Sequence, residues 1–455
     1  MHTDVVILAA GQGSRMKSAL PKVMHPIAGK PMLQHVIDTA NKLENSKLHV
    51  VVGHGAEHVQ KQLDTQAISV ALQAQQLGTG HAVAQALPKC QKEGVVVILY
   101  GDVPLIQATT LQSLLQQAHQ GHLGLLTVEL QDPTGYGRIV RNDVRDVVAI
   151  IEHKDATEEQ REICEVNTGI MAVPCELLNS WLPKLSSENA QGEYYLTDII
   201  AMAAEEGVRI SAIQPETEQE VQGVNNRQQL AELERWYQSQ EAQRLMTAGV
   251  TLYDPARIDV RGKLTVGQDV VIDINCVFEG DVTLADGVTI GPHCVIRNTS
   301  IQTGSCIEAH SLIDGANIGV DAVIGPFARI RPGTELANST KIGNFVEIKK
   351  AVIGQGSKVN HLSYIGDALI GENSNIGAGT ITCNYDGVNK SQTEIGDGAF
   401  IGSNTALVAP VKVGHQATIA AGSTITKDTP DGQLAVARAQ QKLVSHWKRP
   451  TKRQS

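Results

Sequence analysis

The sequence is poor in the features on which several protein classes depend. Aromatic residues occupy only 3% of its 455 positions, so aliphatic side chains must supply most of any core. Its seven cysteines are an odd number without a Cys-x-x-Cys pair, which argues against a disulfide framework or a zinc site and favours a reducing compartment. There is no basic-then-apolar leader and no segment of membrane-spanning length. We therefore expect a cytoplasmic protein without a membrane partner.

Positive charge is also scarce overall. The formal net charge is −10, which disfavours a nucleic-acid partner. The stretch from Leu434 to Ser455 is the exception, because it has six basic residues, Arg438 among them, and no acidic one. The length predicts two or three domains, with ample size for a core.

The half of the chain from about Phe278 to Ile425 repeats every six residues. Apolar anchors recur at this interval in runs that include those beginning at Phe278, Ile324 and Ile395. A small residue stands two positions before most anchors and glycine commonly follows, as with Ala322 and Gly325 around Ile324. A period of six suits neither a helix nor an ordinary strand pair, and it is the hexapeptide signature of a parallel β-helix.

Each six-residue unit supplies one face and one corner of such a coil. The anchor points inward, the small residue fits the narrow corner, and glycine relieves the turn. Three faces close a coil of about 18 residues, and successive coils stack at roughly 4.8 Å. Occasional steps are five residues long, as from Ile296 to Ile301. The period does not choose the hand of the coil, although the general crossover rule favours the right-handed sense.

One interruption of the period is a candidate site. After Ile376 and Ile381 the period fails until Ile395, and the insert Thr382–Lys390 is polar and rich in turn-forming residues. A loop on a rigid coil can reach a neighbouring molecule, and sites often occupy such loops. Nearby outward positions carry polar residues that either solvate the coil or belong to a site: Arg331, Lys349, His361, Tyr364 and Asn375.

The first domain opens with a buried-type strand, Asp4–Leu8, that runs into the glycine-rich turn Gly11–Gly13. Such a turn exposes backbone N–H groups, and the N-terminus of a following helix would add positive potential; both favour phosphate. The turn lacks the third glycine of the dinucleotide fingerprint and the Gly-Lys-Ser/Thr of a P-loop, so plain strand–helix packing stays an alternative. Arg15 and Lys22 add cations at the same end of the strand, which favours the phosphate interpretation.

Further strands, Leu48–Val52 and Val95–Tyr100, alternate with helical stretches. This rhythm predicts a mostly parallel sheet covered on both faces. The second strand ends in Gly101-Asp102, and a carboxylate at the carboxyl edge of a parallel sheet either binds a ligand or caps a turn. Gln73 and the segment Leu77–His81 either read a base edge with amide, hydroxyl and backbone groups or form a plain loop.

The composition of the sequence changes at Asn225. Residues 226–246 have helix-forming composition and an apolar stripe that includes Leu233 and Trp236, and Ala248-Gly249 ends them. A single long helix of this kind acts as a strut between domains. We therefore predict a first domain of residues 1–227, a linker helix of residues 228–248, and a coil with a basic tail over residues 249–455.

Two signatures carry a resemblance to known families. The segment Leu8–Met16, followed by Pro21-Lys22, is similar to the L-A-A-G-x-G-T-R-M…P-K motif of sugar-1-phosphate nucleotidylyltransferases, with Ser14 for the commoner Thr. The repeats resemble left-handed β-helix acyltransferases. Head, helix and coil in this order resemble the bifunctional bacterial enzymes that make UDP-N-acetylglucosamine from glucosamine 1-phosphate. The resemblance covers essentially the whole chain, including these motifs: Gln73, Leu77–His81, Tyr100–Asp102, Gly135–Ile139, Glu152–Lys154, Asn167–Gly169 and Gly223–Asn226.

This resemblance implies an α/β protein with a Rossmann-like uridylyltransferase (pyrophosphorylase) head and a left-handed parallel β-helix that assembles as a homotrimer. Its product would feed peptidoglycan and lipopolysaccharide (lipid A) synthesis. In the head, the sugar 1-phosphate oxygen would attack the α-phosphate of UTP in line and pyrophosphate would leave. That chemistry demands positioning and charge neutralisation more than a covalent partner.

The resemblance assigns individual residues of the head as well. Asp102 and Asn225 would hold Mg²⁺, a hard cation that prefers oxygen ligands. The other expected contacts are Leu8, Ala9, Ala10, Gly11, Arg15 and Lys22 for phosphate, Gln73, Gly78 and Thr79 for uracil, Gly137, Glu152 and Asn167 for the sugar, and Tyr100 and Gly101 beside them.

The coil would transfer the acetyl group of acetyl-CoA to glucosamine 1-phosphate before uridylyl transfer. The amine must lose a proton to attack the thioester, so a base of near-neutral pKa is needed, and His361 aligns with the family's base. Arg331 and Lys349 would clamp the phosphate, and Tyr364 and Asn375 would bind the sugar. In the family, sites lie between adjacent coils of the trimer, and the insert 382–394 is expected to cross. The expected acetyl-CoA contacts are Ala378, Asn384, Tyr385, Ser403, Ala421 and Arg438.

Two other functions stay open. A plain sugar nucleotidylyltransferase would use the coil only to oligomerise, which His361, the paired Arg331 and Lys349 and the basic tail disfavour. A non-catalytic scaffold, as in the translation-initiation exchange factor whose subunits resemble this head plus coil, need not keep a catalytic head, which Lys22 and Asp102 disfavour. Thiol release from acetyl-CoA separates the first from the bifunctional enzyme, and binding of UTP with Mg²⁺ separates the second.

Overall fold

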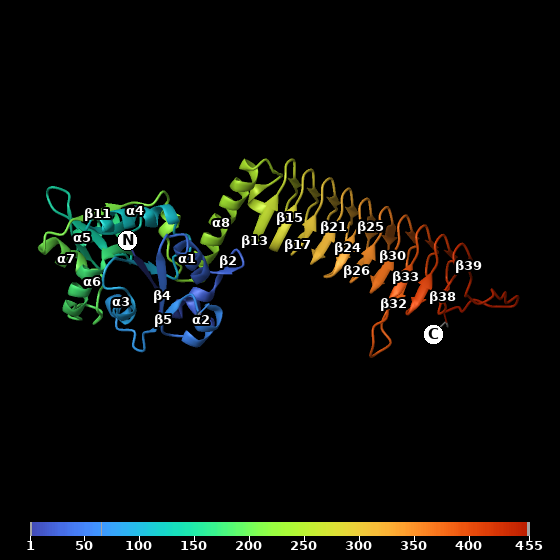
Figure 1. The fold of residues 1–455 in the computed structure, drawn as a ribbon, viewed down its shortest axis with the longest axis horizontal. Helices are drawn as coiled ribbons and strands as arrows, with labels where there is room; N and C mark the ends of the chain where they lie inside the picture. Colours follow the sequence, from blue (N-terminus) through green and yellow to red (C-terminus); the bar gives the residue numbers. More distant parts are fainter. Residues whose placement is uncertain (1, 65, 453–455) are drawn as a thin grey trace. The chain divides into compact units, whose positions relative to one another are not determined.

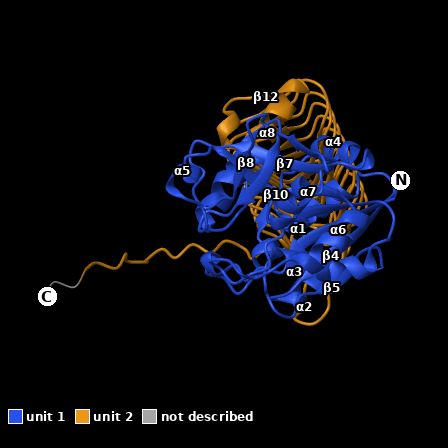
Figure 2. Ribbon diagram, turned by 90° about the vertical axis from the view of Figure 1, so that its left-hand side faces the viewer, with its two compact units in different colours: residues 1–237 blue, residues 238–455 orange. Residues whose placement is uncertain are grey.

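The computed structural model describes residues 2–64 and 66–452 (Figure 1). Two compact units, residues 1–237 and 238–455, make up the chain (Figure 2). The division falls inside the helix α8 (Arg227–Thr247). The three-part division with a separate linker of residues 228–248 stays a prediction. No helix in the described part of the chain is both long enough and apolar enough to cross a membrane.

The first unit is built on the mostly parallel sheet that the sequence predicts. Its strand order is β11-β7-β10-β6-β1-β4-β5, and along this path β10 runs antiparallel to both neighbours while the other pairs are parallel. A hairpin of β8 and β9 extends the sheet beside β10. The strands are β1 (Thr3–Ala9), β4 (Ser46–Val52), β5 (Ser69–Leu72), β6 (Val95–Tyr100), β7 (Leu123–Glu129), β8 (Arg138–Arg141), β9 (Val147–Ile151), β10 (Glu165–Pro174) and β11 (Ile210–Ile213).

Helices cover both faces of this sheet, which explains the continuous apolar runs of its central strands. Side chains of β1 alternate between two cores, with Val5 and Ile7 on one face and Val6 and Leu8 on the other. The first face packs against α1 (Met32–Ala40), α2 (Ala56–Gln62) and α4 (Ala108–His119), and the second against α3 (Thr79–Ala86), α6 (Cys175–Trp181) and α7 (Asp198–Glu205).

The glycine-rich turn differs from the prediction in one respect. Within the described residues 10–31, β1 is followed not by an α-helix but by two short 3₁₀ turns, η1 (Ser14–Met16) and η2 (Lys22–Met24). Gly13 has a φ of +62°, and a Cβ there would lie 2.7 Å from the Lys22 Cβ, so glycine lets the chain fold back against Lys22. The expectation of a helix N-terminus at this turn was therefore wrong, and any attraction for phosphate must come from backbone N–H groups and side-chain cations.

The second unit is the predicted parallel β-helix, whose stacked coils are visible in Figure 1. One face is an 11-stranded sheet from β12 (Thr251–Leu252) to β39 (Leu434–Ala435), and the other two faces belong to a 17-stranded sheet. Each coil pairs in parallel with the next one, as Cys306 pairs with Val323 and Val323 with Lys341. Anchors such as Ile342 are fully buried. The hand of the coil stays a prediction.

The strands that carry or flank the candidate site residues and the insert in this unit are short. They are β23 (Arg329–Ile330), β25 (Lys341–Asn344), β26 (Glu347–Lys349), β28 (Lys358–His361), β29 (Tyr364–Gly366), β31 (Asn375–Ile376), β32 (Ile381–Cys383) and β33 (Thr393–Ile395). The insert between β32 and β33 stands out from the stack in Figure 1, and Tyr385 and Lys390 form an isolated antiparallel bridge within it.

One predicted anchor was wrong. Ile381 is 48% exposed, whereas Thr382 is fully buried and pairs with the inward-pointing Leu407. The Thr382 hydroxyl accepts a hydrogen bond from the Gly366 N–H at 2.7 Å and donates to the Gly366 carbonyl at 3.0 Å. It thereby replaces ladder bonds that the backbone does not supply, because the chain leaves the coil after β32.

Candidate active sites

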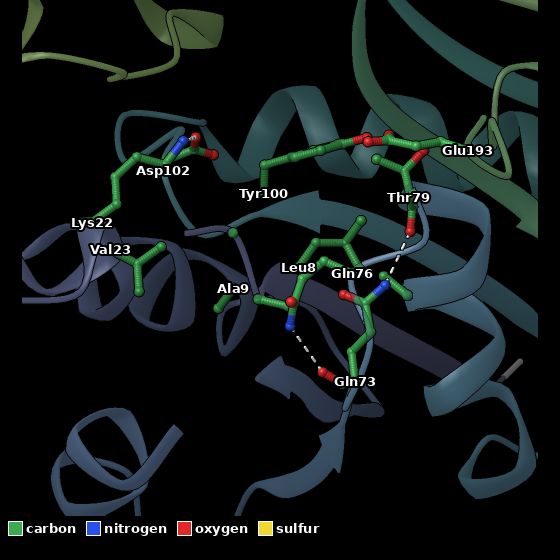
Figure 3. A pocket seen from close by; sticks show the side chains of 14 residues that line it. Leu8, Ala9, Lys22, Val23, Gln73, Gln76, Thr79, Tyr100, Asp102 and Glu193 are labelled. Atoms are coloured by element: carbon green, nitrogen blue, oxygen red, sulfur yellow. Dashed lines mark hydrogen bonds and ion pairs between the residues drawn. The ribbon is translucent and has the colours of Figure 1, made fainter. Parts of the chain in front are cut away.

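A pocket of about 280 Å³ lies at the carboxyl edge of the parallel strands of the first unit (Figure 3). Loops that follow β1, β5 and β6 line it, as expected for a sheet of this kind. It contains Val23, Gln76, Ala82 and Glu193, which sequence reasoning missed. The predicted residues that line it are Leu8, Ala9, Ala10, Gly11, Lys22, Gln73, Gly78, Thr79, Tyr100 and Asp102.

One end of the pocket is a rigid polar loop. The buried Gln73 amide donates to the Gly78 carbonyl at 3.1 Å and to the His81 ring at 3.1 Å. Gly78 has a φ of +109°, and a Cβ there would lie 2.6 Å from the Tyr194 carbonyl oxygen. The loop therefore approaches the Tyr194 backbone closely, and its amide, hydroxyl and backbone groups are fixed before any ligand binds.

Cations and oxygen donors meet at the other end. The Lys22 ammonium contacts the Asp102 carboxylate and lies 3.2 Å from Asn225 Oδ1, and Arg15 Nη2 donates to the same amide oxygen at 2.9 Å. Figure 3 shows Lys22 and Asp102 pointing toward one another. Asn225 is held from behind, because its N–H donates to Gln229 Oε1 at 2.8 Å. A carboxylate and an amide oxygen that share one cation are a donor set that fits Mg²⁺.

The three residues predicted to bind the sugar, Gly137, Glu152 and Asn167, lie close to one another, and we call them the sugar wall. A Cβ on Gly137 would lie 3.5 Å from Glu152 Oε1, and the Asn167 N–H donates to the Gly137 carbonyl at 2.8 Å. Burial raises the pKa of Glu152, and the Thr197 hydroxyl donates to its Oε1 at 3.1 Å. Thr197 was missed because no local pattern in the sequence connects it with Glu152.

Tyr100 links this wall to the cation end. A Cβ on Gly169 would lie 2.5 Å from the Tyr100 ring, so the two are in close contact. Burial raises the pKa of the Tyr100 phenol, and the nearby carboxylates of Glu152 and Asp102 add to this effect. Gly101 packs below, where its N–H donates to the Leu8 carbonyl at 2.9 Å.

In the second unit, His361 stands at a corner of the coil, at the end of β28. Its Nδ1 lies 2.8 Å from Oδ1 of Asn344, which is its register partner in the preceding coil. An amide oxygen accepts hydrogen bonds, so Nδ1 carries the proton and Nε2 keeps its lone pair. This is the tautomer that a general base needs. Sequence reasoning missed Asn344, although the coil repeat itself would have pointed to it.

The face that follows this corner carries the two predicted cations. Arg331 and Lys349 occupy equivalent positions in successive coils, and Tyr364 lies beside them on β29. Arg331 Nη1 donates to Glu347 Oε1 at 2.8 Å, a partner that the sequence did not suggest. Asn375 lies elsewhere, on β31 of the 11-stranded sheet, so the structure does not bring it to this face.

Small residues continue the corner of His361 through later coils. Backbone hydrogen bonds between successive coils stack four predicted residues in order: His361, Ala378, Ser403 and Ala421. Arg438 Nη1 donates to the Ala421 carbonyl at 2.9 Å, so the first cation of the basic tail reaches the same corner. Because Ala378, Ser403 and Ala421 have small side chains, the corner of the coil stays narrow beside the His361 imidazole.

The two predicted contacts in the insert lie apart from that corner. The Asn384 amide donates to the Asp367 carboxylate at the next corner, beyond β29. Tyr385 is 59% exposed. Within one chain, the structure does not bring these residues to His361.

A further polar cluster lies at the amino-terminal edge of the first unit's sheet. Asp4, His49 and Cys90 each place one possible ligand atom within 4.8 Å of the others. The Asp4 carboxylate already interacts with His49 Nε2 at 2.7 Å and accepts from the Gln91 N–H at 2.8 Å. These bonds satisfy the buried carboxylate, so we assign the cluster to the core.

Comparisons with known proteins cover almost the whole chain. Residues 5–168 match the MobA-like NTP transferase domain, residues 260–339 the GMPPB C-terminal domain, and residues 392–427 the bacterial transferase hexapeptide of six repeats. The chain is 62% identical to the "Bifunctional protein GlmU" of Marinobacter nauticus over 98% of this chain and 99% of that one. It is 61% identical to the protein of the same name from Cellvibrio japonicus over 99% of each chain, and 58% identical to that of Burkholderia vietnamiensis over 99% of this chain and 100% of that one. The chain therefore belongs to the family of bifunctional GlmU proteins.

Proposed function

We propose that the protein makes UDP-N-acetylglucosamine in two steps. The second unit acetylates glucosamine 1-phosphate with acetyl-CoA, and the first unit then transfers a uridylyl group from UTP to N-acetylglucosamine 1-phosphate and releases pyrophosphate. The observation that carries this proposal is that one chain holds both a pocket lined by Lys22 and Asp102 and a histidine, His361, whose Nδ1 faces the Asn344 amide oxygen and so leaves Nε2 for the role of base. We place the protein in the cytoplasm, upstream of peptidoglycan and lipid A synthesis.

In the first unit, Gln73, Gly78 and Thr79 hold the uracil ring. Backbone N–H groups of residues 8–11, with Arg15, take up the phosphates, and Gly137, Glu152 and Asn167 orient the sugar. Mg²⁺ held by Asp102 and Asn225 would neutralise phosphate charge when bound. Lys22 exchanges its Asp102 partner for the transferring phosphate, so the residues supply position and positive potential rather than a covalent intermediate.

The Asp102→Ala variant tests this assignment. We expect loss of pyrophosphate release from UTP and N-acetylglucosamine 1-phosphate, because one of the two oxygen donors is removed. CoA release from acetyl-CoA and glucosamine 1-phosphate should stay at the wild-type rate. Unchanged UDP-sugar formation by the variant would contradict the role of Asp102.

In the second unit, Nε2 of His361 takes a proton from the amine of glucosamine 1-phosphate as its nitrogen attacks the thioester carbon. The carbon–sulfur bond then breaks, and the His361 imidazolium returns its proton to the departing sulfur, so CoA leaves as the thiol. Asn344 holds the Nδ1 proton and stabilises the imidazolium, and Arg331 and Lys349 bind the sugar phosphate. His361→Ala should lower the rate of CoA release by about 10²–10⁴-fold and spare uridylyl transfer. A wild-type rate of CoA release would refute the role of His361.

We also propose that the acetyl-transfer site forms between the coils of a homotrimer. Within their own chain, Asn384 and Tyr385 lie away from His361, and Asn375 lies on a different face from Arg331 and Lys349. Val388 at the tip of the insert is 84% exposed. These groups would complete the site of a neighbouring copy. Mixing the inactive variants His361→Ala and Asn384→Ala, then unfolding and refolding them together, should restore CoA release in mixed trimers. No recovery, or a monomer in sedimentation, would contradict the shared site.

A further inference from the structure

Arg138, in the segment Gly135–Ile139, has no part in the chemistry described above, yet its side chain is only 1% exposed. Taking a guanidinium out of water is costly unless its N–H groups find partners. A buried apolar side chain at the start of β8 would carry no such cost. The partners of its hydrogen bonds therefore indicate what Arg138 contributes to the structure.

The guanidinium joins three segments through neutral acceptors. Nη1 donates to the Tyr136 carbonyl, and Nε and Nη2 both lie 3.3 Å from the carbonyl of Arg161, at the end of α5 (Glu158–Arg161). Nη2 also lies 3.4 Å from Nδ1 of His153. Arg161 returns a bond from its Nε to the His153 carbonyl at 3.3 Å. The planar fork of arginine fits several acceptors at once, which a lysine ammonium does less well.

These contacts lie next to two residues of the proposed sugar wall, Gly137 and Glu152. Tyr136 directly precedes Gly137, and His153 directly follows Glu152. In addition, Arg138 pairs with Ile151 across β8 and β9, so Arg138 touches the chain on both sides of the gap between Gly137 and Glu152. A shift of its guanidinium would therefore move Gly137 and Glu152 relative to each other.

We propose that Arg138 is a positioning residue that fixes the separation of Gly137 from Glu152 and thereby sets the affinity of the first unit for sugar 1-phosphate. This inference rests on the proposed role of Gly137 and Glu152 in holding the sugar. We expect no change at the nucleotide end of the pocket, because the Gln73 loop and Lys22 are held by other contacts.

Two substitutions at this position and one matched control test the inference. Arg138→Met removes the fork, and Arg138→Lys keeps the charge but can satisfy fewer of the acceptors. Arg141→Met is the control: Arg141 is on the same strand, and its side chain makes a half-buried bidentate pair with Glu165, at 2.7 and 2.8 Å, and donates to the Arg145 carbonyl rather than to a residue next to Gly137 or Glu152. For each variant, kcat and KM are measured separately for N-acetylglucosamine 1-phosphate and for UTP, with CoA release and melting temperature alongside.

We expect Arg138→Met to raise the KM for N-acetylglucosamine 1-phosphate by about tenfold or more, since displacements on the order of 1 Å have large effects on reacting groups. The KM for UTP and the rate of CoA release should hold, and Arg138→Lys should show a smaller rise. Arg141→Met should change the melting temperature without changing the KM for the sugar.

Equal rises in both KM values, or the same sugar effect in Arg141→Met, would overturn the inference in favour of a purely structural role. If Arg138→Met fails to fold, Arg138→Lys decides, and an unchanged sugar KM in that variant is also a refutation. Glu152→Gln is measured in parallel. A raised sugar KM there with none in the Arg138 variants rejects only this inference, whereas no effect in either rejects the proposed sugar site itself.

Discussion

Replacing Lys22 by methionine tests how the first pocket balances its charges before ligands bind. The Lys22 ammonium contacts the Asp102 carboxylate and lies 3.2 Å from Asn225 Oδ1, so it holds both oxygen donors proposed for Mg²⁺. A divalent cation can bind there only by displacing the ammonium, whereas a bound triphosphate offers the ammonium another partner. We therefore expect Lys22→Met to bind divalent cations more tightly than the wild type when nucleotide is absent.

The size of this effect follows from the shielding of the pair. The Lys22 and Asp102 side chains are only 15% and 16% exposed, so the contact is stronger than a surface ion pair of about 0.2–1 kcal/mol. A hydrogen bond between charged groups contributes about 1.5–3 kcal/mol, and each 1.4 kcal/mol is tenfold in affinity. Removing the competing ammonium should therefore tighten divalent binding by about 10- to 100-fold.

Mn²⁺ is a suitable probe, because the electron paramagnetic resonance signal of the free ion reports binding without turnover. Titrations are run with and without UTP on the full-length wild type, Lys22→Met and Lys30→Met. The control removes an exposed pair in the same unit, Lys30 with Asp38 at 2.6 Å, and should leave Mn²⁺ affinity unchanged. Equal affinities of the wild type and Lys22→Met without UTP would refute the competition. Asp102→Asn shows separately whether this carboxylate binds the metal at all.

Substitutions at three other positions test the packing and the electrostatics of the two units. Thr382→Val should destabilise the coil by about 1–3 kcal/mol, because the buried N–H and carbonyl of Gly366 lose their partner, while Thr382→Ser should keep most of the stability in calorimetry. Ile342→Ala should leave a cavity in the stack and lower the free energy of unfolding by about 2–5 kcal/mol in denaturant titrations. Glu152→Gln should raise the melting temperature at neutral pH, because burial raises the pKa of Glu152 and the charged carboxylate therefore disfavours the folded state. This gain should shrink as the pH falls toward the ordinary pKa of a glutamate, 4.5.

The β-helix could be predicted from sequence because every coil meets the same physical demand. Each inward position must fill the bore and each corner must be narrow, so more than a hundred residues repeat one short rule. The error at Ile381 arose where this repetition ends. Both Ile381 and Thr382 are β-branched strand residues, so the sequence does not say which of them points inward. In the structure it is Thr382, which is buried and whose hydroxyl bonds to Gly366.

The first pocket was predictable to the extent that its residues follow strands. Asp102 comes two residues after the end of β6, and Lys22 follows a glycine-rich turn after β1, so both fall at the ligand-binding edge of a parallel sheet. Asn225 lies far along the chain, two residues before the start of α8, and no local pattern connects it with Asp102; the family resemblance alone supplied it. Glu193 enters the pocket from an irregular segment without periodicity, so neither pattern nor spacing could locate it.

The two units share a way of holding cations in the absence of ligand. In the first, Lys22 pairs with Asp102; in the second, Arg331 pairs with Glu347 at 2.8 Å. The Lys22–Asp102 pair is shielded from solvent, so an unpaired cation there would destabilise the fold and the carboxylate removes that cost; the Arg331–Glu347 pair is about a third exposed, so the same effect is weaker there. A phosphate must then compete with the carboxylate, so its affinity reflects the difference between two pairings rather than the full strength of one. Because the substrate and the product of each step both carry phosphate, this competition weakens the binding of both and favours release of the product. If Lys22 and Arg331 bind phosphate as proposed, Glu347 and Asp102 would affect turnover as well as stability without taking part in proton transfer.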